Sequence, residues 1–374
     1  MKSRAAVAFE PGKALEIVEV DVQDPKAHEV MVKIDFTSVC HTDIYTLSGD
    51  DPSAKFPCIL GHEATGTVYK VGPDVTDFSV GDKVVPLWKP ECGQCEYCKK
   101  GLNFCSAIAD TQGEGVMPDG TSRFSYQGET IYHFMGTSTF SEYTVLADIS
   151  LAKIPEDAPQ DKVALLGCGV TTGMGAVKND AKFQPGSSAA VFGVGTLGLA
   201  AIQMLKRLDA KEIIAVDIND DKEAMAREAG ATHFINSSKL DQPVQDYIIE
   251  CTDGGVDYSF VCVGHVDTMN AGLEATHKGW GQSVIMGVAA GQEKISTRPF
   301  QLITGREWKG SSFGGVQGRS GLPKVIADYQ AGKIDLEPFI SHHLAFEDIN
   351  EAIRLQEAGQ SLRDILSFEE VNNA

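Results

Sequence analysis

Four cysteines lie close together in the first third of the sequence. Cys92, Cys95, Cys98 and Cys105 are separated by two, two and six residues. Four thiolates at such spacings can complete a tetrahedral Zn²⁺ shell that leaves no position for a substrate. Iron–sulfur clusters and redox dithiols also use closely spaced cysteines, but the spacing found in ferredoxins differs from this one. The segment therefore predicts a structural zinc site, in a lobe at about residues 88–110.

Other candidate metal ligands are dispersed along the chain. Cys40 stands in the segment VCHTD, His62 and Glu63 follow each other in GHE, and Cys168 stands in GCG. A catalytic zinc uses three protein ligands, commonly thiolate and imidazole, and keeps a fourth position open. A lone cysteine, however, is more often a small buried apolar residue. Spacing alone therefore leaves both interpretations of these residues open.

A glycine-rich segment in the middle of the chain has the G-x-G-x-x-G pattern, at Gly193, Gly195 and Gly198. It follows a predicted strand at 189–192 and begins a predicted helix at 196–207, which is the expected context of a dinucleotide-binding loop. The glycines permit a tight turn, a close approach of the pyrophosphate and close packing of helix on strand, and the helix N-terminus attracts phosphate. The segment predicts a Rossmann-type cofactor site.

The next predicted strand ends at Asp217, nineteen positions after Gly198. A carboxylate at this place accepts hydrogen bonds from the ribose hydroxyls and repels the 2′-phosphate of NADP. The following residues, Ile-Asn-Asp-Asp at 218–221, include no arginine that would compensate. NAD is therefore the expected cofactor.

The expected elements divide the chain into two domains. The first 150 residues are rich in short strands, whereas strands alternate with helices from 187 to 288, which predicts a parallel sheet. The expected fold is α/β, with a Rossmann-type domain at 171–311 inserted in a β-rich catalytic domain made of 1–170 and 312–374. The expected strands are 30–34, 66–71, 83–87, 189–192, 213–216, 233–235, 257–263 and 283–288, and the expected helices are 196–207, 222–229 and 266–276.

Composition limits the possible partners. The formal net charge is −20, so nucleic acids and anionic membranes would be repelled. The N-terminus does not read as a signal peptide, and proline and glycine interrupt the uncharged stretch at 183–205, so no membrane-spanning helix is expected. We expect a cytoplasmic enzyme that acts on a small molecule and binds neither nucleic acid nor membrane.

Longer segments resemble the zinc-containing medium-chain alcohol dehydrogenases, over nearly the whole chain. They are VCHTD at 39–43, LGHEATG at 60–66, MPDGTSRF at 117–124, HFMGTSTFSEYTV at 133–145, LLGCGV at 165–170, DGGVDYSF at 253–260 and TRPFQLITGREWKG at 297–310. The resemblance is greatest to the class III branch, the glutathione-dependent formaldehyde dehydrogenases, also called S-(hydroxymethyl)glutathione dehydrogenases. It implies a GroES-like catalytic domain and a homodimer or homotetramer that pairs through the sheet edge of the nucleotide domain.

The resemblance also assigns roles to the dispersed ligands. Cys40, His62 and Cys168 would bind a catalytic zinc, and Glu63 would lie beside the metal as a transient ligand. Asp43 would orient His62, as carboxylates do for zinc-bound imidazoles. Such a zinc lowers the pKa of an alcohol hydroxyl, and the alkoxide then donates a hydride to the nicotinamide.

The remaining roles concern the proton, the cofactor and the substrate. They are proton transfer from the hydroxyl by Thr42, pyrophosphate contacts by His41 and Arg363, a contact near the adenosine ribose by Lys222, and substrate contacts by Asp51 and Lys278.

The sequence departs from the class III pattern around the substrate. The glutamine and arginine that hold the glutathione carboxylates there correspond to Ser106 and Ala109, and Asp110 follows. Ser53 replaces an acidic residue, and Tyr45 replaces the histidine that extends the proton relay in many relatives. The leading hypothesis is an NAD-dependent zinc dehydrogenase acting on a primary alcohol or on S-(hydroxymethyl)glutathione. The alternatives are a general primary or aromatic alcohol dehydrogenase and, remotely, a non-catalytic nucleotide-binding scaffold.

Overall fold

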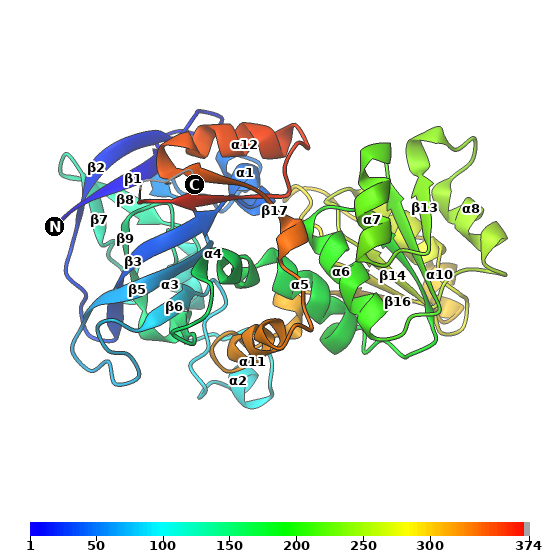
Figure 1. The fold of residues 1–374 in the computed structure, drawn as a ribbon, viewed down its shortest axis with the longest axis horizontal. Helices are drawn as coiled ribbons and strands as arrows, with labels where there is room; N and C mark the ends of the chain where they lie inside the picture. Colours follow the sequence, from blue (N-terminus) through cyan, green and yellow to red (C-terminus); the bar gives the residue numbers. More distant parts are fainter. Residues whose placement is uncertain (370–374) are drawn as a thin grey trace. The chain divides into compact units, whose positions relative to one another are not determined.

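The computed structural model describes residues 1–369 and divides the chain into two compact units. The first unit consists of Met1–Cys168 together with the segment that begins at Gln317, and the second unit is Gly169–Val316. The sequence had suggested boundaries after residues 170 and 311. The second unit is thus an insertion in the chain of the first, as the colours of Figure 1 show.

The first unit is built mainly from strands, which form a closed barrel and a seven-stranded sheet. The barrel consists of β1 (Lys2–Ala8), β2 (Glu16–Val22), β7 (Phe124–Tyr126), β8 (Glu129–His133) and β4 (Cys58–Ile59). The sheet consists of β10 (Leu151–Lys153), β6 (Lys83–Pro86), β5 (Glu63–Val71), β3 (Glu29–Ser38), β18 (Arg363–Ser367), β17 (Ile340–Ala345) and β9 (Tyr143–Ala147), which pairs with β3.

Strand β3 lies inside the sheet of this unit and contains a run of buried apolar residues. Val30, Met31, Val32 and Ile34 are all fully buried. The strand pairs with β5, β9 and β18, so its carboxyl end brings segments distant in sequence together. The observed strand runs from Glu29 to Ser38. The strand predicted at 30–34 is therefore the core of a longer one.

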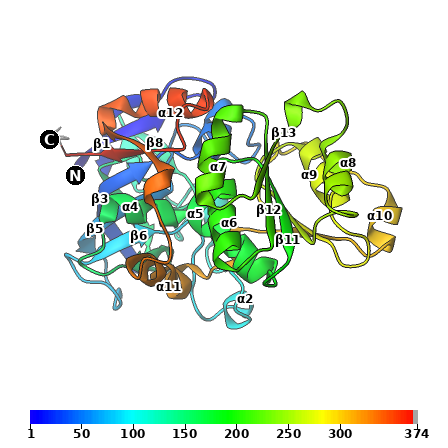
Figure 2. The ribbon, with the colours of Figure 1, turned by 45° about the vertical axis from the view of Figure 1, so that its right-hand side comes forward.

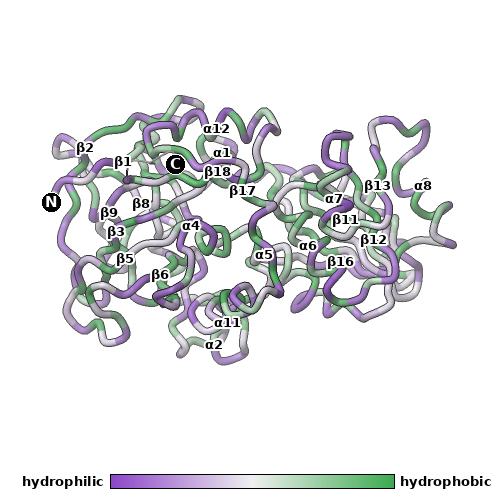
Figure 3. Tube along the Cα trace, viewed as in Figure 1, coloured by the Kyte–Doolittle hydropathy of each residue, from purple (hydrophilic) through white to green (hydrophobic). Residues whose placement is uncertain are grey.

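Helices connect the strands of the first unit, and some of them pack against these strands. They are α1 (His41–Ser48), α2 (Glu96–Lys99), α3 (Ala109–Gly113), α4 (Gln160–Val163), α11 (Gly318–Gln330) and α12 (Ile349–Glu357). In α11 the buried residues Gly318, Leu322 and Ile326 recur every four positions, and the tube of Figure 3 alternates there between hydrophilic and hydrophobic colours. This is the pattern of a helix with one buried face.

The second unit contains a six-stranded parallel sheet in the order β13-β12-β11-β14-β15-β16, which is the Rossmann strand order. Helices α6 and α7 lie on one face of the sheet, and α8 and α9 lie on the other (Figure 2). The elements are α5 (Gly169–Gly175), β11 (Ser188–Phe192), α6 (Thr196–Arg207), β12 (Glu212–Asp217), α7 (Glu223–Ala229), β13 (His233–Asn236), α8 (Val244–Cys251), β14 (Tyr258–Val261), α9 (Val266–Glu274), β15 (Gln282–Ile285), α10 (Pro299–Ile303) and β16 (Glu307–Gly310). The predicted α/β fold class is confirmed.

Differences from the predicted elements arise at their ends. The helix expected from residue 222 begins at Glu223, because Asp220–Lys222 form a tight turn in which the Asn219 side chain accepts a hydrogen bond from the Asp221 N–H. The strand expected at 283–288 ends at Ile285, where the chain turns into a glycine-containing loop. Among residues 1–369, no helix has the length and apolar character needed to cross a membrane.

Candidate metal centres and nucleotide-binding loop

The first unit brings the dispersed metal ligands together. Atoms of Cys40, His62, Glu63 and Cys168 that could bind a metal all lie within 4.8 Å of one another. Cys40 precedes the first turn of α1, His62 and Glu63 stand at the start of β5, and Cys168 ends a short helical turn. Strand β3 leads directly to Cys40 and pairs with β5, so the sheet register places Cys40 beside His62.

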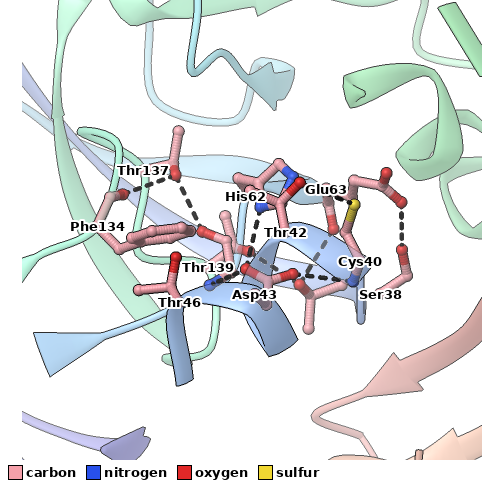
Figure 4. A network of polar contacts seen from close by, with 12 residues as sticks. Ser38, Cys40, Thr42, Asp43, Thr46, His62, Glu63, Phe134, Thr137 and Thr139 are labelled. Atoms are coloured by element: carbon pink, nitrogen blue, oxygen red, sulfur yellow. Dashed lines mark hydrogen bonds and ion pairs between the residues drawn. The ribbon is translucent and has the colours of Figure 1, made fainter. Parts of the chain in front are cut away.

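Asp43 fixes the orientation of two of these ligands, as Figure 4 shows. Its Oδ1 accepts hydrogen bonds from His62 Nδ1 at 3.0 Å and from the Gly61 N–H at 3.0 Å. Its Oδ2 accepts one from the Cys40 N–H at 2.9 Å. The ring of Phe134 meets the imidazole edge-on, with ring centroids 5.9 Å apart.

The donor set fits a zinc ion. His62 is fully buried, and its Nε2 makes no hydrogen bond to any residue in the described part of the chain. A buried nitrogen without a hydrogen bond is costly unless it binds something else. Two sulfurs and one imidazole nitrogen are a zinc ligand set that leaves a fourth position for another group. These residues therefore suit a catalytic zinc.

The charges of the cluster depend on one another. Contact with the Cys168 thiol, with help from Arg363 and His62, holds the pKa of Cys40 well below its ordinary value. The same contact, together with burial, raises the pKa of Cys168. Burial alone would lower the pKa of His62, but Asp43 and Cys40 outweigh it and raise that pKa well above its ordinary value. The lowered pKa of Cys40 favours its thiolate, which is the form that binds a divalent cation.

Arg363 lies against this cluster. Its guanidinium donates to Glu63 Oε2 at 2.8 Å from Nε, and from Nη2 to Glu63 Oε1 at 3.0 Å and to Cys40 Sγ at 3.3 Å. Burial raises the pKa of Glu63 even though the guanidinium opposes it. Arg363 was expected at the cofactor pyrophosphate. Its observed partners are candidate metal ligands, and the cofactor contact stays a prediction.

The four clustered cysteines converge as expected of a structural site. The sulfurs of Cys92 and Cys98 are 4.0 Å apart and those of Cys95 and Cys105 are 3.9 Å apart, close to the roughly 3.8 Å between thiolates on a tetrahedral zinc. Cys92 Sγ accepts N–H bonds from Gln94 and Cys95. Backbone N–H groups of Cys98 and Ser106 lower the pKa of Cys95 to about 6, which favours the thiolate that binds metal.

The glycine-rich loop has the geometry of a dinucleotide-binding turn. Gly193 has a φ of 92°, and a Cβ on Gly198 would lie 1.9 Å from the Gly193 carbonyl oxygen. A Cβ on Gly195 would meet nothing within 4 Å, which leaves space against the backbone at the start of α6. Asp217, at the end of β12, accepts N–H bonds from Val194 at 2.7 Å and from Ile218 at 2.8 Å. Its carboxylate is thereby held beside the loop.

The other predicted residues lie in less constrained places. Thr42 Oγ1 is 3.8 Å from Cys40 Sγ (Figure 4). The Tyr45 hydroxyl donates to the Asp50 carbonyl oxygen at 2.9 Å, so it binds its own loop. His41 is exposed at the first position of α1. Lys222 is half-buried and lies in the turn Asp220–Lys222, which follows strand β12.

The predicted substrate residues are less well defined. Asp51 Oδ1 accepts from the Ser53 N–H and Oγ at 2.9 and 2.6 Å, so Ser53 holds this carboxylate within its loop. Lys278 is exposed in the second unit. Ser106, Ala109 and Asp110 are exposed, and helix α3 carries an acidic residue in its first turn but no basic residue in its last turn.

Ser38 was missed by the sequence analysis. It ends β3, is fully buried, and its Oγ donates to Glu63 Oε2 at 2.8 Å. A serine at the end of a strand carries no sequence signal of its own, because only the register of β3 on β5 places it opposite Glu63.

A strand-rich unit with two clusters of candidate zinc ligands, in one chain with a Rossmann unit, is the combination expected of a zinc-binding dehydrogenase. The profile of the alcohol dehydrogenase GroES-like domain matches residues 26–156, and that of the zinc-binding dehydrogenase domain matches residues 196–330. An S-(hydroxymethyl)glutathione dehydrogenase of Escherichia coli O1:K1 / APEC is 55% identical over 369 residues, which cover 98% of this chain and 100% of the relative. The chain belongs to the zinc-containing alcohol dehydrogenase family, as the class III-like resemblance had indicated.

Solved structures agree with this assignment. An alcohol dehydrogenase zinc-binding domain protein from Burkholderia ambifaria has a TM-score of 0.91 at 32% identity. The benzyl alcohol dehydrogenase of Acinetobacter calcoaceticus has a TM-score of 0.91 at 30% identity. Each match covers 99% of this chain and 100% of the other.

Proposed function

We propose that this enzyme transfers a hydride between a primary alcohol, or the hemithioacetal S-(hydroxymethyl)glutathione, and NAD. The observation that carries the proposal is the buried His62 Nε2, which has no hydrogen bond among the described residues and lies with two thiols and a carboxylate within 4.8 Å. Such a centre supports a metal-assisted reaction, and it argues against a non-catalytic scaffold.

Different residues are proposed to bind the metal, to orient a ligand and to transfer the proton. When bound, zinc supplies a Lewis acid that makes an alcohol hydroxyl acidic near neutral pH. Cys40, His62 and Cys168 would hold it. Asp43 accepts the Nδ1 proton of His62 and so leaves Nε2 as the ligand atom. Thr42 can accept the hydroxyl proton and pass it on, since its Oγ both donates and accepts.

The cofactor proposal rests on the second unit. The turn at Gly193 and the open backbone at Gly195 leave room for a pyrophosphate at the start of α6. Asp217 places a negative charge beside this loop, where the 2′-phosphate of NADP would be repelled. NAD is therefore favoured, with His41, Lys222 and Arg363 as further proposed contacts.

The substrate proposal has two versions. The curated relative is named S-(hydroxymethyl)glutathione dehydrogenase, which favours the glutathione adduct. However, the exposed segment with Ser106, Ala109 and Asp110 offers no cation to a glutathione carboxylate, and Asp51 is held by Ser53. These observations, and the structural similarity to a benzyl alcohol dehydrogenase, favour a neutral primary or aromatic alcohol as the second candidate.

Steady-state kinetics would separate the two versions. The zinc-loaded enzyme is assayed with NAD and either formaldehyde plus glutathione, octanol or benzyl alcohol, and zinc is counted per chain. The proposal expects two zincs and a preferred substrate among these three. A chain that binds two zincs and NAD but oxidises none of them would contradict it.

We also propose a homodimer or homotetramer that pairs along the sheet of the second unit. Strand β16 lies at the end of the sheet order, and an edge strand presents N–H and C=O groups for pairing. On the nearby helix α10, Phe300 and Ile303 are 71% and 73% exposed. Light scattering in solution would test the assembly. The cytoplasmic location expected from the sequence stays a prediction.

A further inference from the structure

The Glu63 carboxylate is held from two strands at once. Ser38, at the end of β3, donates to Oε2 at 2.8 Å, and Arg363, at the start of β18, donates to both oxygens at 2.8 and 3.0 Å (Figure 4 shows the Ser38 bond). Ser38 is opposite Glu63 in the register of β3 on β5, so the sheet itself fixes this contact. All three side chains are at most 6% exposed.

The same carboxylate is close enough to act as a metal ligand. One of its oxygens lies within 4.8 Å of the donor atoms of Cys40, His62 and Cys168, and carboxylate oxygens are zinc ligands. An oxygen that accepts two hydrogen bonds must lose them or share them before it can bind a metal. The strength of these bonds therefore sets how often Glu63 joins the other three ligands.

Ser38 and Arg363 differ in how they hold Glu63. Arg363 also donates to Cys40 Sγ at 3.3 Å, so its guanidinium is shared between two residues of the cluster. Among residues 1–369, the Ser38 hydroxyl donates only to the carboxylate, and it carries no charge. Removing the Ser38 hydroxyl therefore lets the Glu63 side chain change conformation more easily, while the charges of the site stay the same.

We propose that Ser38 is a positioning residue, which keeps Glu63 turned toward Arg363 and thereby keeps the fourth position of the catalytic metal open. The inference rests on the catalytic metal proposed above. In Ser38→Ala, Glu63 occupies that position more often. A hydrogen bond to a charged group shifts such an equilibrium on the order of tenfold. A probe that needs the open position then binds more weakly, in proportion to the fraction of molecules in which the position is open.

The test uses the full-length enzyme with Co²⁺ in the catalytic site, because cobalt absorbs visible light in a way that reports its ligands. Imidazole is titrated as the probe, and the absorption spectrum is the readout, independent of turnover. We expect Ser38→Ala to bind imidazole more weakly, by at most about tenfold, with a spectrum shifted before imidazole is added. Ser38→Cys keeps a weak hydrogen-bond donor, so its affinity for imidazole should lie between those of the parent and of Ser38→Ala.

Two controls separate the carboxylate from packing. In a Glu63→Gln background, Ser38→Ala should leave the imidazole affinity unchanged. Thr37 is the matched neighbour, since it is fully buried and its Oγ1 donates to the Glu63 backbone oxygen at 3.1 Å rather than to the carboxylate. Thr37→Val should lower the melting temperature but preserve the affinity for imidazole.

The outcomes are distinguishable. Equal imidazole affinity in the parent and in Ser38→Ala overturns the role of Ser38 while leaving the metal site intact. A loss of affinity that persists in the Glu63→Gln background also overturns it, because the effect would not pass through the carboxylate. A parent whose cobalt spectrum does not respond to imidazole contradicts the proposed catalytic site as well.

Discussion

Asp43 is a single buried residue that fixes the positions of two candidate metal ligands. Its side chain is 1% exposed and accepts three hydrogen bonds, from His62, from the Gly61 N–H and from the Cys40 N–H. One carboxylate of helix α1 is thus hydrogen-bonded to the backbone of Cys40 and to the imidazole of His62, the two candidate ligands. The conformational entropy of these side chains is therefore lost when the chain folds and not when a metal binds. This is what preorganisation means at a functional site.

Cys168→Ser replaces one sulfur atom by oxygen and tests whether Cys168 binds the proposed catalytic metal. The change replaces a sulfur of the cluster but touches neither the four-cysteine lobe nor the glycine-rich loop. We expect turnover to fall by at least about a hundredfold, since even residues that only support metal ligands cost about 10–100-fold. Turnover, zinc content and thermal melting are measured together. Activity within tenfold of the parent at unchanged zinc content would rule out Cys168 as a ligand.

His133 makes stability depend on pH. Burial, with help from Arg123, lowers its pKa to about 3, so the folded protein keeps the imidazole neutral. The unfolded chain binds a proton near pH 6.5 and the folded chain does not, so stability falls as pH falls from that value toward 3. The expected loss is about 2 kcal/mol between pH 7.5 and pH 5.

His133→Gln is the matched variant for this prediction. Glutamine can still accept the Arg123 N–H that now donates to Nε2 at 3.1 Å, but it does not titrate. Denaturant unfolding at both pH values gives the comparison. The variant should lose less stability than the parent over this range, and equal losses would assign the acid sensitivity to other groups.

At the scale of the elements, local pattern predicted some parts and not others. Helix α6 was predicted with its observed bounds, because a glycine turn precedes it and an apolar repeat continues through it. The barrel of β1, β2, β7, β8 and β4 was not predicted as a closed structure, because its closure depends on pairings such as that of β1 with β4, about fifty residues apart. The gathering of Cys40, His62 and Cys168 depends on the same kind of long-range pairing and was indicated only by family resemblance.

Cys95→Ala tests the lobe as an independent element. The four sulfurs already face one another, and zinc bound there contributes to the stability of the folded lobe. The variant should lose about one zinc per chain and melt more than about 5 °C lower. Metal analysis and calorimetry give the result. A variant with two zincs and the parent melting temperature would show that the lobe is held by other contacts.

Asp217→Ser tests the end of β12 as the selector of the cofactor. The change removes the charge beside the glycine-rich loop, so NADP should be tolerated better and NAD should lose a contact. The ratio of kcat/KM for NAD over NADP should fall about 10–100-fold, the range expected for a charge-assisted hydrogen bond. A constant ratio would mean that the carboxylate, which already accepts backbone N–H bonds from Val194 and Ile218, does not face the ribose.

At the scale of the whole molecule, the charge is the feature that the family resemblance does not explain. The chain carries 52 acidic and 32 basic residues. A molecule with this balance repels anions at long range and slows their approach when salt is low. A glutathione adduct is an anion and a long-chain alcohol is not, so the charge of the molecule acts on the two proposed substrate classes differently.

Ionic strength and one substitution therefore test the substrate together. Between about 0.01 M and 0.2 M salt the Debye length shortens from about 30 Å to below 10 Å, so repulsion of an anion is screened. If the adduct is the substrate, its kcat/KM should rise with salt in the parent, while kcat/KM for octanol should stay constant.

Ala109→Arg adds a cation on the exposed helix α3, next to Asp110. It should raise kcat/KM for the adduct about tenfold at low salt and less at high salt, without affecting octanol. Equal responses of adduct and octanol would show that position 109 does not face the anionic end of the substrate. A parent that already prefers the adduct, with no dependence on salt, would instead assign glutathione binding to other groups, among which the exposed Lys278 is the first to replace.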